Sequence, residues 1–486
     1  MENNFFKIGI WYSIGQLLVK GVAFLLIPLY SKYLGAEIYG QLALVDIVYN
    51  FVGMFIIFSI HSGYIRFYKD DRNNNGFATV FNFSLISIFV QGIIIFSFGK
   101  HFSDFLLKME NSYFILILIF IRGSLEQIIT LLEVDYSMKY YVKKLIILKL
   151  AITIITFISI LYYVIVQKNN IAGIYIGYII GNFIILFYML YDNKDKLKII
   201  IDYIFLKECF KFSTGLLLGN ISYLILAAID RYFLKEYRSF SDVGIYSMGY
   251  KFASLIEVFF IMSFKKVFTP FKFQEYQNKN FEYKINKFFD YYNILGMFFF
   301  LLISVNIKFI LSIFSTKEFL GAYLITPIIT FSYLLYGQIE FYSLGINLKN
   351  KTYITSFILV LGSIINIILN VFWIKSYGMY GAASSTIVSY IIMMSLYIYV
   401  SQKLYYIKFN FIKMIKIIIL CIIVYIFYLI FSFGKINNII LETIMGNMLL
   451  VVYIIIIFKS ILSMEERLEI FNFLQNRIFK IKKIIK

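Results

Sequence analysis

Apolar runs of about 20 residues recur along the whole of this 486-residue sequence. A helix of about 20 residues crosses a bilayer core of roughly 30 Å. The chain is 61% hydrophobic and 15% charged, whereas soluble domains carry about 25% charged residues. The alternating ten-residue segments of a membrane β-barrel are absent from the sequence. The sequence therefore predicts an all-α polytopic membrane protein.

The apolar runs predict about fourteen transmembrane helices. They are expected near residues 8–30, 42–63, 78–99, 112–134, 145–166, 171–191, 212–234, 244–264, 288–314, 322–346, 353–374, 379–400, 411–432 and 439–460. A shift of 204 positions places Phe6-Lys7 on Phe210-Lys211 and Gly40 on Gly244. A repeat this long suits two copies of a multi-helix unit. We expect two pseudo-symmetric six-helix bundles plus two C-terminal helices.

These segments divide the sequence into four predicted parts. An N-terminal bundle covers 1–200, a C-terminal bundle 201–402, and two additional transmembrane helices 403–462. Residues 463–486 form a basic tail with apolar residues at helical spacing, and Ser463 precedes Glu466 as in a capping box. We expect this amphipathic tail to lie on the anionic cytoplasmic leaflet.

The positive charges indicate the orientation. Of the 46 lysines and arginines, 32 lie in the N-terminus, every second loop and the tail, against nine in the alternate loops. This bias predicts that both termini lie in the cytoplasm. It also explains the net charge of +19 without a nucleic-acid partner.

The sequence carries no enzyme motif that we recognise. The P-loop and the GxSxG elbow are absent, the two histidines fall on opposite predicted sides of the membrane, and the two cysteines match no metal motif. We therefore expect no catalytic residue, no metal and no cofactor. The sequence instead suggests a protein that transports a substrate across the membrane.

Polar residues inside the apolar runs are the candidate site, because a charge at mid-membrane costs at least about 2.5–3.5 kcal/mol. The candidate substrate-binding cations are Lys20, Arg122, Lys251 and Arg231. The candidate cavity-lining polar residues are Ser13, Gln16, Asp46, Asn50, Asn220 and Ser254. Glu257 and Asp46 are the candidate ion-coupling acids. The simplest geometry is a cavity between two bundles.

Structural roles compete with these assignments. Arg122 and Glu126 are four residues apart on one helix and can neutralise each other. Asp230-Arg231 is as consistent with a structural ion pair as with a ligand site. Glu257 is either the partner of Lys251 or a proton or sodium site.

Three motifs resemble those of a known family. They are Lys32-Tyr33-Leu34-Gly35 with Tyr39-Gly40, Asp230-Arg231-Tyr232-Phe233-Leu234 with Val243-Gly244-Ile245-Tyr246-Ser247, and Asn370-Val371 with Tyr377-Gly378 and Gly381-Ala382-Ala383. All three resemble inter-helix turns of bacterial polysaccharide-unit flippases, the O-antigen or Wzx-type exporters of the MOP/MATE-like superfamily. The resemblance covers the full chain.

The resemblance implies a protein of the bacterial cytoplasmic (inner) membrane that works by alternating access. Its implied cargo is an undecaprenyl-pyrophosphate-linked oligosaccharide, which it moves to the outer leaflet. The oligosaccharide is then used to assemble a surface polysaccharide such as the O-antigen of lipopolysaccharide. It maps the family's basic cavity residues onto Lys20 and Lys251 by helix position. A partnership with polysaccharide polymerase machinery is also expected. The alternatives are an ion-coupled multidrug or metabolite antiporter of the same superfamily, and a scaffold subunit of an export assembly.

Overall fold

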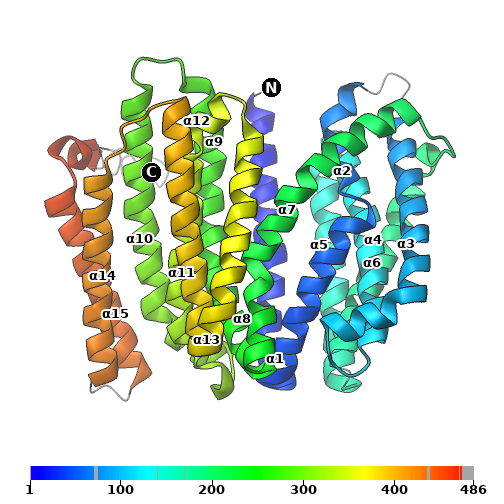
Figure 1. The fold of residues 1–486 in the computed structure, drawn as a ribbon, viewed down its shortest axis with the longest axis horizontal. Helices are drawn as coiled ribbons and strands as arrows, with labels where there is room; N and C mark the ends of the chain where they lie inside the picture. The colour runs from blue at the N-terminus through cyan, green and yellow to red at the C-terminus, as the bar shows by residue number, and fades with distance from the viewer. Residues whose placement is uncertain are drawn as a thin grey trace, which may run out of the picture. The chain divides into compact units, whose positions relative to one another are not determined.

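A computed structural model describes residues 2–70, 75–139, 141–168, 170–434, 438–469 and 471–472. Within its helices the side chains of 2–14, 16, 17, 20, 23, 433 and 434 lie outside the description. The described residues are almost entirely helical and contain no strand (Figure 1).

The helices follow one another with short connections. Their bounds are α1 Glu2–Ile56, α2 Ile60–Phe67, α3 Gly76–Leu106, α4 Ser112–Met138, α5 Val142–Leu161, α6 Ile171–Asp192, α7 Tyr203–Tyr237, α8 Phe240–Ala253, α9 Met262–Glu275, α10 Phe281–Phe314, α11 Ala322–Tyr342, α12 Leu344–Leu348, α13 Thr352–Leu404, α14 Phe411–Gly434 and α15 Ile439–Ile456. Turns of π-helix extend α5 (η2, Tyr162–Val166) and α15 (η6, Ile457–Ile461), and another joins α8 to α9 (η4, Glu257–Ile261). Short 3₁₀ turns are η1 Tyr68–Asp70, η3 Lys194–Lys196 and η5 Lys317–Phe319.

Eleven helices of the described chain are long and apolar enough to span a membrane. Two of them, α1 and α13, each contain a second membrane-length segment beyond a sharp kink, and the run from α8 through η4 to α9 adds one more. The described residues thus hold the fourteen segments that the sequence predicts. The all-α polytopic fold is confirmed.

Both kinks lie at glycines. Each kink requires a positive φ angle, which residues with a side chain adopt only with strain. Gly35 has φ +68° and Gly378 has φ +57°. Helical hydrogen bonding resumes directly after each glycine, so the turn expected over residues 34–40 is a kink, visible in the dark blue ribbon of α1 in Figure 1.

A charged side chain stabilises each kink. Glu318 accepts a hydrogen bond from the backbone N–H of Ala36 at 3.0 Å, where the second half of α1 begins. Arg238 donates to the carbonyl oxygens of Lys375 and Ser376 at 3.0 and 3.2 Å, where the first half of α13 ends. An acid at a helix N-terminus and a base at a C-terminus both complement the helix dipole.

Other segment boundaries differ from the sequence-based expectation. The charged stretch 265–287 was predicted as a linker, but α9 continues to Glu275 and α10 begins at Phe281. Two of its lysines are paired within the protein: Lys265 and Lys272 both contact Glu340 of α11, at 3.2 and 3.0 Å. These two ion pairs lie on the helical part of the stretch.

The chain divides into two compact units. One comprises Met1–Ser247, Phe314–Phe319 and Leu359–Ser385, and the other Met248–Ile313, Leu320–Ile358 and Thr386–Lys486. The division into bundles 1–200 and 201–402, with 403–462 and 463–486 as separate parts, stays a prediction. In the first unit α4, α5 and α6 pack together and against α1.

The repeat of 204 positions has a direct counterpart in the first unit. A Cβ built on Gly40 would lie 1.9 Å from the carbonyl oxygen of Phe240, and one built on Gly244 would lie 2.0 Å from that of Ala36. Ala36 and Gly40 are the repeat equivalents of Phe240 and Gly244. The two copies of the motif therefore touch each other reciprocally, as residues beside a twofold axis do.

Candidate functional site: a caged arginine in a polar pocket

Arg122 is the centre of the candidate site. It lies on α4 and is 8% exposed. Its guanidinium carbon is 4.0 Å from the ring centroid of Tyr49, 3.7 Å from that of Tyr178 and 4.9 Å from that of Tyr175. Aromatic faces attract a cation through the ring quadrupole, most strongly where water is excluded. The cage thus stabilises a buried positive charge.

Two carboxylates lie near Arg122 but beyond hydrogen-bond distance. Nη1 is 3.8 Å from Asp46 Oδ1, and Nε is 3.8 Å from Glu126 Oε2. The same oxygens accept hydrogen bonds from tyrosines: Tyr175 donates to Asp46 at 2.9 Å, and Tyr49 donates to Glu126. The tyrosine hydroxyls therefore compete with the arginine for the two acids.

Arg122 and two other residues of the site, Asn182 and Thr156, have buried polar atoms without a hydrogen-bond partner in the part of the chain that the structure describes. Among the described residues, Nε and Nη1 of Arg122, Nδ2 of Asn182 and Oγ1 of Thr156 are buried without a hydrogen-bond partner. A buried polar group without a partner costs about 1–3 kcal/mol. A ligand that brings acceptor oxygens would recover this cost.

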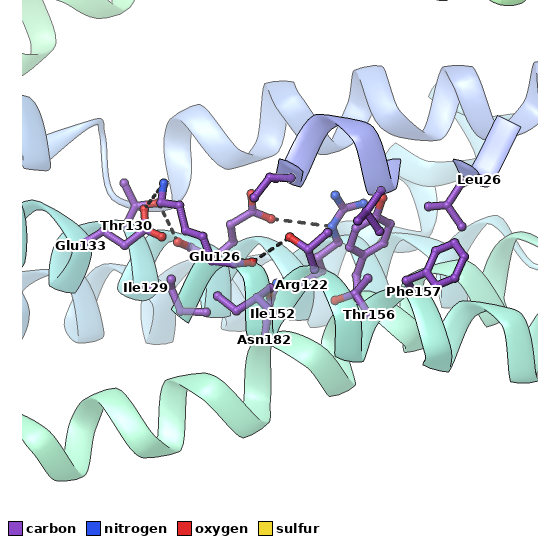
Figure 2. Close-up of a pocket in the computed structure, with 15 residues that line it drawn as sticks. Leu26, Arg122, Glu126, Ile129, Thr130, Glu133, Ile152, Thr156, Phe157 and Asn182 are labelled. Atoms are coloured by element: carbon purple, nitrogen blue, oxygen red, sulfur yellow. Dashed lines mark hydrogen bonds and ion pairs between the residues drawn. The ribbon is translucent and has the colours of Figure 1, made fainter. Parts of the chain in front are cut away.

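The pocket has a volume of about 500 Å³ and lies between α1, α4, α5 and α6 (Figure 2). It is lined by Val19, Val22, Leu26, Arg122, Glu126, Ile129, Thr130, Glu133, Lys149, Ile152, Thr153, Thr156, Phe157, Tyr178 and Asn182. At one end Lys149 Nζ and Glu133 Oε2 form an ion pair of 2.8 Å. The lining charges balance, with two bases and two acids.

The second half of α1, after the kink at Gly35, supplies part of this site. Asp46 lies beside Arg122, as described, and Asn50 is exposed one turn further on, donating to the backbone carbonyl of Asp46 at 2.8 Å. The side chains of Lys20, Ser13 and Gln16 lie outside the described residues. Their roles stay predictions, as does a cationic cavity between two bundles.

Arg231 has a different environment and does not line this pocket. It donates to the carbonyl of Ala227 at 2.7 Å and to Ser247 Oγ at 3.1 Å. Asp230 is 1% exposed, lies 3.6 Å from Arg231 Nη1, and accepts from Tyr246 at 2.6 Å. These contacts favour the structural alternative for the Asp230-Arg231 pair. Asn220 is exposed on α7.

The remaining candidates belong to the second unit. Lys251 is exposed on α8, and Ser254 donates to its backbone carbonyl at 2.7 Å. Glu257 is half-buried and opens the π-helical turn η4. Such turns in α-helices are frequent at functional sites. The roles of all three residues stay predictions.

Several residues of the pocket had no signal in the sequence. The three cage tyrosines are among 42 in the chain, and only tertiary packing selects them. Lys149 lies near the start of the predicted helix 145–166, and Glu133 lies at the end of the predicted helix 112–134. A search for opposite charges inside adjacent predicted helices would have found the Lys149–Glu133 pair.

Comparisons with known proteins agree with this architecture. The model of the polysaccharide biosynthesis protein family matches residues 31–288, more than half of the chain. The structure is similar to that of the lipid II flippase MurJ in an inward closed conformation, with 18% identity, a TM-score of 0.70, and coverage of 93% of this chain and 99% of that chain.

A multidrug resistance MATE family transporter of the MOP superfamily, in an inward-facing conformation, is also similar. The identity is 11% and the TM-score 0.61, over 80% of this chain and 94% of that chain. No curated protein sequence matches this chain. The structural likenesses show the fold, and the motifs and the family match confirm the resemblance seen in the sequence. The chain belongs to the polysaccharide biosynthesis protein family.

Proposed function

We propose that this protein is a flippase that moves a lipid-linked oligosaccharide, with an undecaprenyl-pyrophosphate carrier, across the cytoplasmic membrane for surface polysaccharide assembly. Membership of the polysaccharide biosynthesis family and the MurJ-like fold support a lipid-linked glycan as cargo. The protein is a transporter without catalysis of its own, works by alternating access, and has both termini in the cytoplasm.

The observation that carries the proposal is the set of unpaired donors around Arg122. A pyrophosphate presents several acceptor oxygens, and a guanidinium can donate to two of them at once. Thr156 and Asn182 offer further donors to phosphate or to sugar hydroxyls in the same pocket. Lys20 and Lys251 are proposed as further cations on the substrate path.

The proposal also assigns partners. The glycan passes to a polysaccharide polymerase on the outer side, and the basic tail binds anionic lipid on the inner side. The reciprocal capping box at Ser463 and Glu466, with hydrogen bonds of 2.8 and 3.2 Å, supports the start of the tail helix. Residues 473–486 of the tail lie outside the description.

Replacement of Arg122 tests the proposal. In cells that depend on this protein for surface glycan, Arg122→Gln should reduce export at least about tenfold, because one or two charged hydrogen bonds are lost. The measurement is outer-leaflet glycan per amount of membrane-inserted protein. Arg66→Gln, at an exposed arginine of α2, is the matched control. Normal export by Arg122→Gln at normal protein level contradicts the proposal.

Two acids in the pocket favour a second candidate function. Glu126 and Glu133 line the same cavity as Arg122, and carboxylates suit cationic cargo. An ion-coupled multidrug or metabolite antiporter would lose efflux of cationic dyes from vesicles in Glu126→Gln and Glu133→Gln. The flippase should move no such dye in any of these forms.

A further inference from the structure

A second polar cavity lies in the second unit, at the ends of two spanning helices. Its volume is about 490 Å³. It is lined by residues of the first turns of α10, by residues 408–412 leading into α14, and by Glu466 of the helix that follows Ser463. Because spanning helices α10 and α14 begin here, the cavity lies at the level of lipid headgroups.

Asp290 of α10 lines this cavity and is 7% exposed. Its Oδ2 accepts a hydrogen bond from Lys413 Nζ at 2.9 Å. Its Oδ1 is buried and has no donor in the part of the chain that the structure describes. Lys413 also pairs with Glu466 at 2.7 Å. Within the described residues, two carboxylates thus share this one lysine, and one oxygen of Asp290 keeps an unused acceptor.

The rest of the cavity lining carries positive charge. Lys408 is exposed, and Lys287 pairs with Glu469, which is half exposed. Asn286 of α10 holds the segment that bears Lys408, accepting from the backbone N–H of Asn410 at 3.0 Å and donating to the carbonyl of Lys408 at 2.8 Å. Among the residues that the structure describes, neither Lys408 nor Lys287 is paired with a buried acid. Both can therefore bind a phosphate group.

Exposed apolar side chains include Ile412 of the cavity lining and two residues close to it in the sequence. Tyr406 and Ile412 are each 71% exposed and Ile415 is 49% exposed. They lie in the approach to α14 and in its first turns. A ligand held in the cavity by its polar end can therefore lay acyl chains along this surface, as a membrane lipid does.

We propose that this cavity binds the headgroup of a zwitterionic aminophospholipid of the phosphatidylethanolamine class. The primary ammonium donates to the carboxylate of Asp290, and the phosphate binds Lys287 and Lys408. A choline headgroup has no N–H to donate to Asp290, and a glycerol headgroup has no positive charge to pair with this carboxylate. The inference is independent of the transported cargo.

Native mass spectrometry of the full-length protein, incubated with lipids of matched acyl chains, tests this assignment. Phosphatidylethanolamine should be retained about tenfold better than phosphatidylcholine, the value of one charged hydrogen bond. It should also be retained better than phosphatidylglycerol. Equal retention of the choline lipid, or stronger retention of the glycerol lipid, overturns the proposal.

Variants locate the site. Asp290→Asn should lose the preference for the ethanolamine lipid, whereas Glu110→Gln, at an exposed acid between α3 and α4, should keep it. If Asp290→Asn does not fold, Lys287→Gln with Lys408→Gln should lower retention of the same lipid. An unchanged preference in the folded variants overturns the proposal. Free phosphoethanolamine should not displace the lipid at equal concentration, and full displacement would make the ligand a soluble amine instead.

Discussion

At the scale of single residues, the cage around Arg122 combines two ways of holding a buried cation. The rings of Tyr49, Tyr175 and Tyr178 stabilise the charge, while Nε and Nη1 of Arg122 have no hydrogen-bond partner among the described residues. The two nearby acids are held by tyrosine hydroxyls instead. The arginine is therefore held as a cation while two of its nitrogens remain without an acceptor among the described residues.

Two substitutions at Tyr178 separate the contribution of the aromatic ring from that of the hydroxyl group. Tyr178→Phe keeps the ring face 3.7 Å from the guanidinium and should retain most export activity. Tyr178→Leu removes the ring and should weaken the site by about 0.5–2 kcal/mol, the usual worth of a cation–π contact. Export per membrane-inserted protein is the measurement. Equal activity of the two variants would show that the ring has no electrostatic role.

Sequence reasoning found Arg122 and Asp46, because an ionisable residue inside an apolar run is conspicuous. It could not find the tyrosines that surround them, since contacts between α1, α4 and α6 depend on how the helices pack. The alternative in which Arg122 and Glu126 neutralise each other agrees with their 3.8 Å separation. Whether any predicted site residue binds substrate stays a prediction.

At the scale of elements, polar contacts attach the two additional helices to α10. Glu442 of α15 is 3% exposed and accepts from Lys308 of α10 at 2.7 Å and from Tyr428 of α14 at 3.3 Å. Asn306 of α10 and Asn447 of α15 donate to each other's amide oxygens at 3.2 and 3.0 Å. Lipid offers no competing partner for these groups inside the membrane.

Replacing only one residue of the Lys308–Glu442 ion pair should lower the stability of the protein. Removing one partner of a buried ion pair costs about 3–5 kcal/mol, because the other charge stays buried. Lys308→Met and Glu442→Gln should each lower Tm in detergent, and the double variant should lose less than the sum of the two.

Additive losses would mean that the two side chains act independently. The exposed pair of Lys108 and Glu236, 3.0 Å apart, provides the control, since a surface ion pair contributes only about 0–1 kcal/mol. Its double variant should leave Tm nearly unchanged.

The helical segments were predictable because length and apolar composition decide them locally. Their ends were not. The sequence places inter-helix turns at Gly35 and Gly378, but each is a kink inside one helix, contacted by Glu318 or Arg238, which are distant in the sequence. The charged stretch 265–275 is helical, and Glu340 of α11 pairs with two of its lysines, Lys265 and Lys272. Both effects are tertiary, so a single apolar window could not reveal them.

At the scale of the whole molecule, the reciprocal contact of Gly40 and Gly244 supports the repeat seen in the sequence. Gly40→Ala and Gly244→Ala should each destabilise the protein by about 1–3 kcal/mol, because the new methyl group would meet a backbone carbonyl. The two losses should not add, since either change opens the same contact.

Gly21→Ala is a matched control in the same helix, because a Cβ there would meet nothing within 4 Å. Alanine should be neutral or slightly stabilising at that position, since it favours a helix more than glycine does. Thermal unfolding in detergent measures the three single variants and the double variant at Gly40 and Gly244. Tolerance of alanine at both Gly40 and Gly244 would contradict the close approach.

The reciprocal contact also constrains how such a chain can arise and change. A surface that fits its own repeat is self-complementary, so two separate copies of one half would meet through the same pair of glycines, as a homodimer does across its axis. Fusion of duplicated genes would preserve this contact without any new interface. Each half then restricts substitution in the other: a side chain gained at Gly40 can be accommodated only by a backbone shift at Phe240, and one at Gly244 only by a shift at Ala36.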